Sequence, residues 1–245
     1  MTLSGSAFLA LWNDVDPARD AEYNCWHTFE HVPERVGVDG FLSGRRYVAR
    51  ERSEDRYFTL YELDALSTLD GPAYTDVVDR PTEWSRSMRP SLRNFLRCPC
   101  RTVLTMGAGT AASIATLRFG VGPATSDVDA GTAGSVLQPF LEFTGVTSLH
   151  LGRAHKSSAF PIPNGTSSAF GERGAQHVLL VEGIDRTALQ AAARRIAEAI
   201  ERGIAAVPPV VCNVFDLAFV IERSGLRQPA VKRQPARGDL RGRFG

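Results

Sequence analysis

The order of strand-like and helix-like segments most restricts the fold of this chain, because the same order occurs twice. Apolar runs rich in β-branched and aromatic residues predict strands, and longer segments with helical start signals predict helices. Residues 1–106 and residues 113–222 both give the order strand, helix, strand, strand, helix, strand. Two βαββαβ units in tandem predict an α+β protein built from two ferredoxin-like units.

The first unit has clear start and stop signals. Strands are expected at residues 6–13, 41–50, 57–63 and 101–106. Asp16-Pro17 predicts the start of the first helix, because Asp is a capping residue and Pro suits the first helical position. That helix should run to about Val32, since Pro33 disturbs helical hydrogen bonding. A second helical region is expected at residues 71–95, where two prolines interrupt it.

The second unit repeats this order with weaker signals. Strands are expected at residues 113–121, 145–153, 176–182 and 210–221, and helices at residues 127–143 and 186–202. Residues 107–112 should form a linker between the units, and residues 157–174 a long loop. Residues 223–245 carry seven Lys or Arg residues against one acidic residue, which predicts a basic, flexible tail, although docking to a partner stays open.

A cluster of polar side chains occurs near the end of the first predicted helix, in the sequence His27-Thr28-Phe29-Glu30-His31. Residues four apart on a helix share a face, and the residue three along lies beside them. We therefore expect His27, Glu30 and His31 to converge on one surface. The corresponding helix of the second unit has no histidine, so the cluster belongs to one unit only.

Three interpretations of this cluster remain open. A histidine beside a carboxylate can move protons near neutral pH, which favours His27 and His31 as acid–base groups with Glu30 as the orienting carboxylate. His-x-x-Glu-His is also an inverted zinc-peptidase signature, but no third-ligand motif follows and Pro33 ends the helix, so no metal is predicted. The cluster can also be an ordinary helix surface.

Further residues complete a pattern around the cluster: Trp26 and His27, then His31-Val32-Pro33, Gly40-Phe41 and Arg45-Arg46-Tyr47. The first unit in this respect resembles the dimeric α/β-barrel superfamily, in particular its EthD-like branch. The second unit matches that pattern only in its order of elements and at Gly145 and Arg153.

The resemblance implies that the sheets of the two units pack face to face as one α/β barrel within this chain, with a pocket between each sheet and its helices. It also implies a range of activities: cofactor-free monooxygenation, ring isomerisation, aldol-type cyclisation, dehydration, decarboxylation and haem chemistry. Some proteins of this type serve as accessory proteins without a known reaction, so the fold alone does not determine the function.

We take as the leading hypothesis a cofactor-independent lyase or isomerase that acts on a small hydrophobic cyclic or aromatic carbonyl compound. The catalytic candidates are His27, Glu30 and His31. The substrate-binding candidates are Trp12, Asn13, Arg46, Tyr47 and Tyr61. Arg46 and Tyr47 would polarise the carbonyl group, and the aromatic residues would hold a flat substrate. The alternatives are a non-catalytic ligand-binding protein and a cofactor-free or metal-dependent monooxygenase.

Charge and composition restrict the partners. A formal net charge of +1 does not favour nucleic acid, and no apolar run approaches the length of a membrane span. The N-terminal residues lack the features of a secretion signal, which predicts a cytoplasmic protein with its four cysteines reduced. The expected partners are a small hydrophobic substrate and a second copy of the chain in a homodimer.

Overall fold

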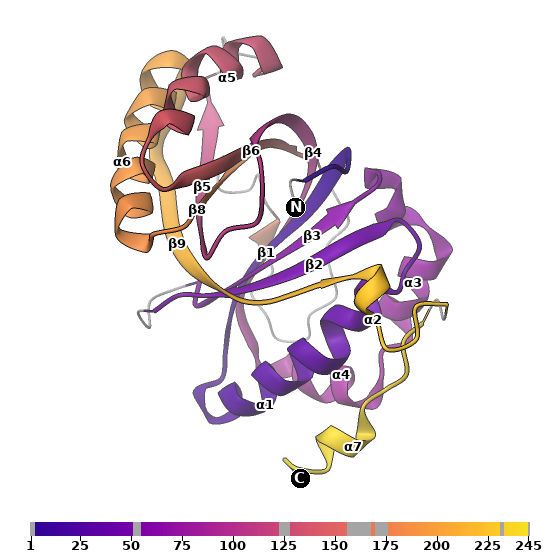
Figure 1. Cartoon of the computed structure of the whole chain (residues 1–245). Helices are drawn as coiled ribbons and strands as arrows, with labels where there is room; N and C mark the ends of the chain where they lie inside the picture. Colours follow the sequence, from indigo (N-terminus) through magenta and orange to yellow (C-terminus); the bar gives the residue numbers. More distant parts are fainter. Residues whose placement is uncertain are drawn as a thin grey trace.

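The structure, a computed structural model, describes residues 3–50, 55–122, 128–155, 168–169, 176–230 and 233–244. Eight antiparallel strands close into a barrel, with helices outside it (Figure 1). The order around the barrel is β1-β3-β2-β9-β5-β8-β6-β4, and pairing of β4 with β1 closes the ring. A closed ring leaves no free edge among these eight strands.

The first unit contributes four strands in the ferredoxin-like order β4-β1-β3-β2. Its strands are β1 (Ala7–Val15), β2 (Phe41–Val48), β3 (Tyr57–Leu63) and β4 (Leu92–Gly107). Its helical elements are η1 (Pro17–Arg19), α1 (Asp20–Trp26), η2 (His27–His31), α2 (Val32–Val36), η3 (Leu66–Asp70), α3 (Pro72–Asp79), α4 (Glu83–Met88) and η4 (Arg89–Ser91).

The second unit repeats this topology in the order β9-β5-β8-β6. Its elements are β5 (Ser113–Val121), α5 (Ala130–Leu137), η5 (Gln138–Glu142), β6 (Val146–Ala154), β8 (His177–Gly183), α6 (Arg186–Gly203) and β9 (Ala206–Glu222). The structure confirms the predicted fold of two ferredoxin-like units in one α/β barrel. The long loop expected at residues 157–174 lies outside the described residues, apart from the short strand β7 (Ser168–Ala169) beside β4.

Two long strands join the units. The first part of β4 pairs with β1 of its own unit, and from Cys100 to Gly107 it pairs with β6 of the other unit. In the same way β9 pairs first with β5 and then, from Asp216 to Glu222, with β2. Both strands extend further than the sequence predicts, since Pro99, Pro208 and Pro209 resemble strand breakers.

The same residue pairing occurs in both sheets. A carboxylate stands one residue before the end of β3 and of β8: Glu62 accepts the backbone N–H of Gly5, and Glu182 accepts that of Ala111. Each lies opposite a serine on the neighbouring strand, Ser43 or Ser148. Each buried glutamate thus ties the segment that leads into the first strand of its unit to the barrel.

The barrel interior is mainly apolar, with side chains from both units in contact. Phe8, Phe58 and Leu60 of the first unit pack against Val178 and Phe215 of the second. Burial of apolar area at this seam stabilises the closed form by roughly 25 cal/mol for each Å² removed from water. The interior also holds a buried ion pair, in which Arg45 Nη1 lies 2.8 Å from Glu182 Oε1.

The helices of each unit cover the outer face of its own sheet (Figure 1). Helices α1 to α4 lie on the first sheet, whereas α5 and α6 lie on the second, where they form a continuous apolar core with it. None of the helices among the described residues is long and apolar enough to cross a membrane.

The C-terminal residues run back over the helices of the first unit, as the gold ribbon of Figure 1 shows. They form η6 (Arg223–Gly225) and the short helix α7 (Gly238–Arg241). Leu226 and Leu240 are buried against the first unit, and Arg233 pairs with Glu34 and Asp76. The described part of the segment expected to be a flexible tail is therefore packed against the protein, because its apolar and basic residues find partners there.

Candidate active site

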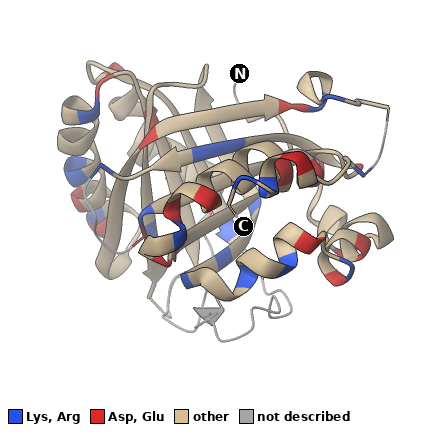
Figure 2. Ribbon diagram, turned by 90° about the horizontal axis from the view of Figure 1, so that it is seen from below, with Lys and Arg blue, Asp and Glu red and all other residues tan. Residues whose placement is uncertain are grey.

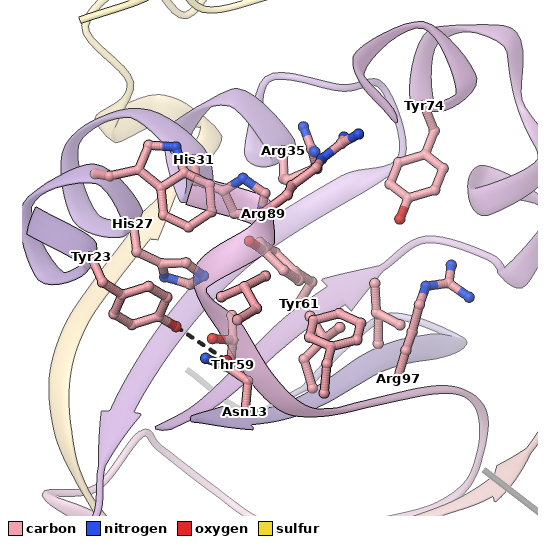
Figure 3. A pocket seen from close by; sticks show the side chains of 15 residues that line it. Asn13, Tyr23, His27, His31, Arg35, Thr59, Tyr61, Tyr74, Arg89 and Arg97 are labelled. Carbon is pink, nitrogen blue, oxygen red and sulfur yellow. Dashed lines mark hydrogen bonds between the residues drawn. The ribbon is translucent and has the colours of Figure 1, made fainter. Parts of the chain in front are cut away.

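A pocket lies between the outer face of the first sheet and the helices that cover it (Figure 3). Its empty volume, including open solvent, is about 570 Å³. The residues that line it are Leu9, Leu11, Asn13, Tyr23, Trp26, His27, His31, Arg35, Thr59, Tyr61, Tyr74, Arg89, Leu92, Phe95 and Arg97.

Both histidines of the cluster lie on a π-helical turn, η2, between α1 and α2. The N–H of Val32 reaches five residues back to the carbonyl oxygen of His27. Pro33 has no N–H to offer the carbonyl of Phe29, so the α-helical hydrogen-bond pattern cannot pass through this point unchanged. The chain nevertheless stays helical to Val36 instead of ending near Val32 as expected.

The two imidazole rings are stacked inside the pocket wall. The ring centroids of His27 and His31 lie 5.0 Å apart, with their planes inclined by 30°. Tyr23 stacks on the other side of His27 at 5.1 Å, and Trp26 lies 4.5 Å from His31. His27 is only 5% exposed. The four rings form one aromatic group that holds the histidines in place.

Burial lowers the pKa of both histidines well below the usual value of 6.5. For His27 the charge of Arg46 lowers the pKa further, and for His31 the charge of Arg35 does so. Both imidazoles are therefore neutral at pH 7. Nδ1 of each ring is buried and has no hydrogen-bond partner among the described residues. A neutral ring with an unpaired nitrogen can accept a proton from a bound molecule, or donate one to it.

Glu30 lies on the other side of the helix. Among the described residues, no hydrogen bond joins its carboxylate to either imidazole. Its Oε1 accepts the hydroxyl of Thr82 at 2.5 Å, and its Oε2 accepts the backbone N–H of Arg237 at 2.6 Å. The π-helical turn holds more residues than an α-helical turn, so the third residue after His27 is rotated away from it. The carboxylate expected to orient the histidines instead anchors their turn from outside.

Three of the expected substrate-binding residues lie outside the pocket lining. Trp12 and Tyr47 point into the barrel, where both belong to the interior core. The indole N–H of Trp12 donates to Thr116 at 3.2 Å. Arg46 points to the helix side, but its guanidinium donates to the carbonyl and side-chain oxygens of Asn24 and to the hydroxyl of Thr28. Arg46 thus fastens the helix to the sheet.

Asn13 and Tyr61 line the pocket, and their expected part in substrate binding stays a prediction. The hydroxyl of Tyr23 donates to Asn13 Oδ1 at 3.1 Å, as the dashed line in Figure 3 shows. Burial raises the pKa of Tyr23 to about 12 and raises that of Tyr61 as well, so both phenols keep their protons. The hydroxyl of Tyr61 is buried and has no partner among the described residues. It is free to donate to a ligand.

Arginines at one side of the pocket were not expected from the sequence. Arg35 on α2, Arg89 on η4 and Arg97 on β4 all line it. A regular spacing could have indicated Arg35, because Tyr23, His27, His31 and Arg35 stand at every fourth position and so share a helix face. Arg89 and Arg97 come from later segments, and no local sequence pattern indicates that they line the same pocket.

The second unit lacks this pocket lining. By strand pairing, Asn13, Thr59 and Tyr61 correspond to Phe119, Leu179 and Val181. These three residues are buried in the apolar core under α5 and α6. Polar pocket residues in one unit are thus replaced by packed hydrophobic side chains in the other.

No group of three or more His, Cys, Asp or Glu side chains among the described residues is placed to hold a metal ion. In the part of the chain that the structure describes, both basic and acidic residues occur on the ribbons seen from below (Figure 2).

The chain is similar to solved structures with the same barrel. An anthrone oxidase-like protein superposes with a TM-score of 0.64 at 10% identity, over 91% of this chain and 95% of that one. A candidate monooxygenase of Fusobacterium nucleatum gives a TM-score of 0.55 at 11% identity, over 91% and 97%. A mutant chlorite dismutase of Candidatus Nitrospira defluvii gives 0.52 at 10% identity, over 88% and 93%.

At these identities the likeness shows the fold, and it agrees with the predicted resemblance at the level of the barrel. No protein-family model matches the chain, and no curated protein matches it.

Proposed function

In a chain with the dimeric α/β-barrel fold, we propose that the pocket of the first unit binds a small, flat, hydrophobic carbonyl compound and moves a proton on it. The reaction class is that of a lyase or isomerase that needs no cofactor for the proton-transfer step. His27 and His31 are the catalytic residues. The observation that carries the proposal is the stacked pair of neutral histidines, each with an unpaired buried Nδ1, in a pocket with apolar walls.

The chemistry follows from the protonation states of the lining residues. One neutral imidazole accepts a proton from the carbon next to the carbonyl group, and the negative charge moves to the carbonyl oxygen. The positive charges of the arginines that line the pocket lower the energy of this negative charge. Return of the proton at another carbon gives an isomer, and loss of a neighbouring hydroxyl group as water gives a dehydrated product.

Leu9, Leu11, Leu92 and Phe95 supply the apolar part of the pocket. They match the flat hydrocarbon body of such a substrate and keep water away from the imidazoles, which preserves their basic, neutral form. Glu30 has no role in this step, because its carboxylate is engaged with Thr82 and Arg237.

Proton exchange tests the proposal without knowledge of the natural substrate. The protein is incubated in D₂O with 1-tetralone, 2-tetralone and anthrone, and NMR follows the loss of the protons next to each carbonyl group or at the acidic ring carbon. We expect the wild-type protein to accelerate exchange on at least one probe. The double variant His27→Gln/His31→Gln should lower that rate by roughly 10²–10⁴-fold.

His155→Gln is the matched control, since His155 is an exposed histidine at the end of β6 and should leave the rate unchanged. Exchange that the double variant retains in full, or no acceleration on any probe, contradicts the proposal.

A monooxygenase is the second candidate function, and the likeness to an anthrone oxidase-like protein and to candidate monooxygenases favours it. The same deprotonation would start it. The carbanion of anthrone would take up O₂, with one oxygen atom retained as the new carbonyl of the quinone and the other released as water. Consumption of O₂ with anthrone in the presence of the protein separates this reaction from isomerisation, which consumes none.

A non-catalytic ligand-binding protein remains the alternative from another class. It would bind the same probes without accelerating proton exchange. The homodimer and the cytoplasmic location stay predictions. Light scattering would measure the mass in solution and so test the homodimer.

A further inference from the structure

We propose that the substrate of this pocket carries a carboxylate group, which Arg35 binds at the opposite end from the imidazole of His27. This inference rests on the proposed function only in taking the same pocket as the substrate site. It adds an acidic group to the flat, hydrophobic compound and fixes the direction in which that compound lies.

Arg35 is the residue that carries the inference. It is 3% exposed and lies on α2, one helical turn beyond His31. Its Nη1 donates to Glu34 Oε2 at 2.8 Å, whereas its Nη2 is buried and has no partner among the described residues. A buried guanidinium with an unsatisfied donor destabilises the protein, and more so than an uncharged polar group would. A ligand that accepts this donor removes that cost.

Glu34, the acidic partner of Arg35, is shared with a second arginine. Glu34 also pairs with Arg233 of the C-terminal segment, with Arg233 Nη2 at 3.2 Å from Glu34 Oε1. Glu34 therefore serves two guanidinium groups, of which that of Arg233 also pairs with Asp76. The pocket lining adds two further arginines, Arg89 and Arg97, and contains no Asp or Glu among the described residues.

The arginines lie close enough for their charges to act on one another and on the tyrosine hydroxyls. The pKa of Arg89 is lowered by burial and, after that, by the charge of Arg35. Figure 3 shows the guanidinium groups of Arg35 and Arg89 on the side of Tyr61 and Tyr74, away from His27. Like charges that repel in a desolvated site are relieved by a bound anion.

The unpaired hydroxyl of Tyr61 supplies a second donor on the same side of the pocket. Arg35 Nη2 and the Tyr61 hydroxyl suit a carboxylate ligand, which accepts at both oxygens. Glu34 takes only Nη1 of Arg35, and no Asp or Glu is among the described residues that line the pocket. The apolar residues Leu11, Leu92 and Phe95 line the same pocket and suit the ring system that joins this carboxylate to the carbon that loses its proton.

Paired probes of equal shape test the inference. Isothermal titration calorimetry measures the Kd of 2-naphthoate and 2-naphthamide, and of anthraquinone-2-carboxylate and its amide, with the full chain at pH 7. Within each pair the ring body is the same and only the charge differs. We expect the carboxylate to bind at least tenfold more tightly than the amide in one pair or both.

The variant Arg35→Met should bind the carboxylate and the amide about equally tightly. The variant Arg35→Lys should keep part of the preference, because it keeps the positive charge but loses the planar guanidinium group. Arg202→Gln is the matched control, since Arg202 lies on α6 of the second unit with a side chain 74% exposed, and it should keep the full preference. Circular dichroism checks that each variant is folded.

The wild-type measurement alone decides the matter even if Arg35→Met does not fold. Equal affinity for both members of each pair, or binding of neither member, overturns the inference, as does a folded Arg35→Met variant that keeps the preference. The double variant His27→Gln/His31→Gln should lose proton exchange but keep the carboxylate preference, so failure of the catalytic proposal and failure of this one give different results.

Discussion

The imidazole rings of His27 and His31 are stacked, with centroids 5.0 Å apart and planes inclined by 30°, and neither ring lies beside an acidic group in the pocket lining. A proton on one ring therefore raises the cost of a proton on the other, and no carboxylate offsets it. The pair works best as a neutral acceptor of a single proton.

The rate of proton exchange should accordingly remain constant through neutral pH and fall only in acid. Both pKa values are lowered below 6.5, so the neutral form persists until the pH drops through the lowered values. The measurement is the pH profile of exchange on the best probe, from about pH 4 to about pH 9. An acid limb with its midpoint at 6.5 or above would show that the histidines are not desolvated.

Stability should fall as the pH falls below about 6.5. The folded protein holds His27 and His31 neutral, whereas the unfolded chain protonates them near 6.5, so the unfolded state binds more protons in acid. Each such histidine contributes a slope of up to about 1.4 kcal/mol per pH unit. Urea unfolding at several pH values should give a smaller slope for His27→Gln/His31→Gln. The remaining slope includes His150, whose pKa burial lowers to about 4.

Glu30→Gln should reduce stability and leave the pH profile of the reaction in place. Its carboxylate accepts from Thr82 and from the N–H of Arg237, and an amide keeps only one acceptor atom, which costs about 1–3 kcal/mol. Denaturant unfolding measures the loss. A shifted acid limb in the profile of a folded Glu30→Gln variant would mean that this carboxylate does orient a histidine.

Leu240→Ala should destabilise the protein by about 2–4 kcal/mol, because the buried leucine of α7 packs in the same cluster as Tyr23, Trp26 and Trp84. Val211→Ala on the exposed side of β9, where the valine is 41% exposed, should cost much less. Thermal unfolding compares the two. Equal effects would indicate that the C-terminal segment does not pack as described.

Gly44→Ala should perturb the pocket through the contact between α2 and the sheet. A Cβ at this position would lie 2.7 Å from Val32 Cγ1 and 3.2 Å from Tyr61 Cε1, closer than packed carbons approach. We expect a loss of about 1–3 kcal/mol together with weaker probe binding. Gly134→Ala in α5 meets no atom within 4 Å and should stabilise its helix by roughly 0.5–1 kcal/mol. Calorimetry and probe titration on both variants check this contrast.

Much of the fold could be predicted because the apolar patterns are local. The strands observed at Tyr57–Leu63 and Ser113–Val121 have the expected bounds, and the helix Arg186–Gly203 differs from the expectation by one residue. The long strand Leu92–Gly107 was foreseen only in its second part. Its first part contains Pro99 and several polar residues, and it becomes a strand through pairing with β1, which no local pattern reveals.

The site was harder to predict, because it depends on the direction of each side chain. Adjacent strand residues point to opposite faces, so Trp12 and Asn13, or Arg46 and Tyr47, do not line the same pocket. The structure places Asn13 in the pocket and Trp12 in the barrel. The direction of the Glu30 side chain depends on the π-helical turn, which a standard helical wheel does not represent.

The long strands β4 and β9 have a consequence for how this site persists. Because each strand hydrogen-bonds to both units, neither unit can open without breaking the ladder of the other, and unfolding should be a single cooperative event. The apolar second unit thus contributes stability that the first unit shares. This stability offsets the cost of the crowded arginines and unpaired imidazoles in the first unit. A domain of half this size buries less surface with which to offset that cost.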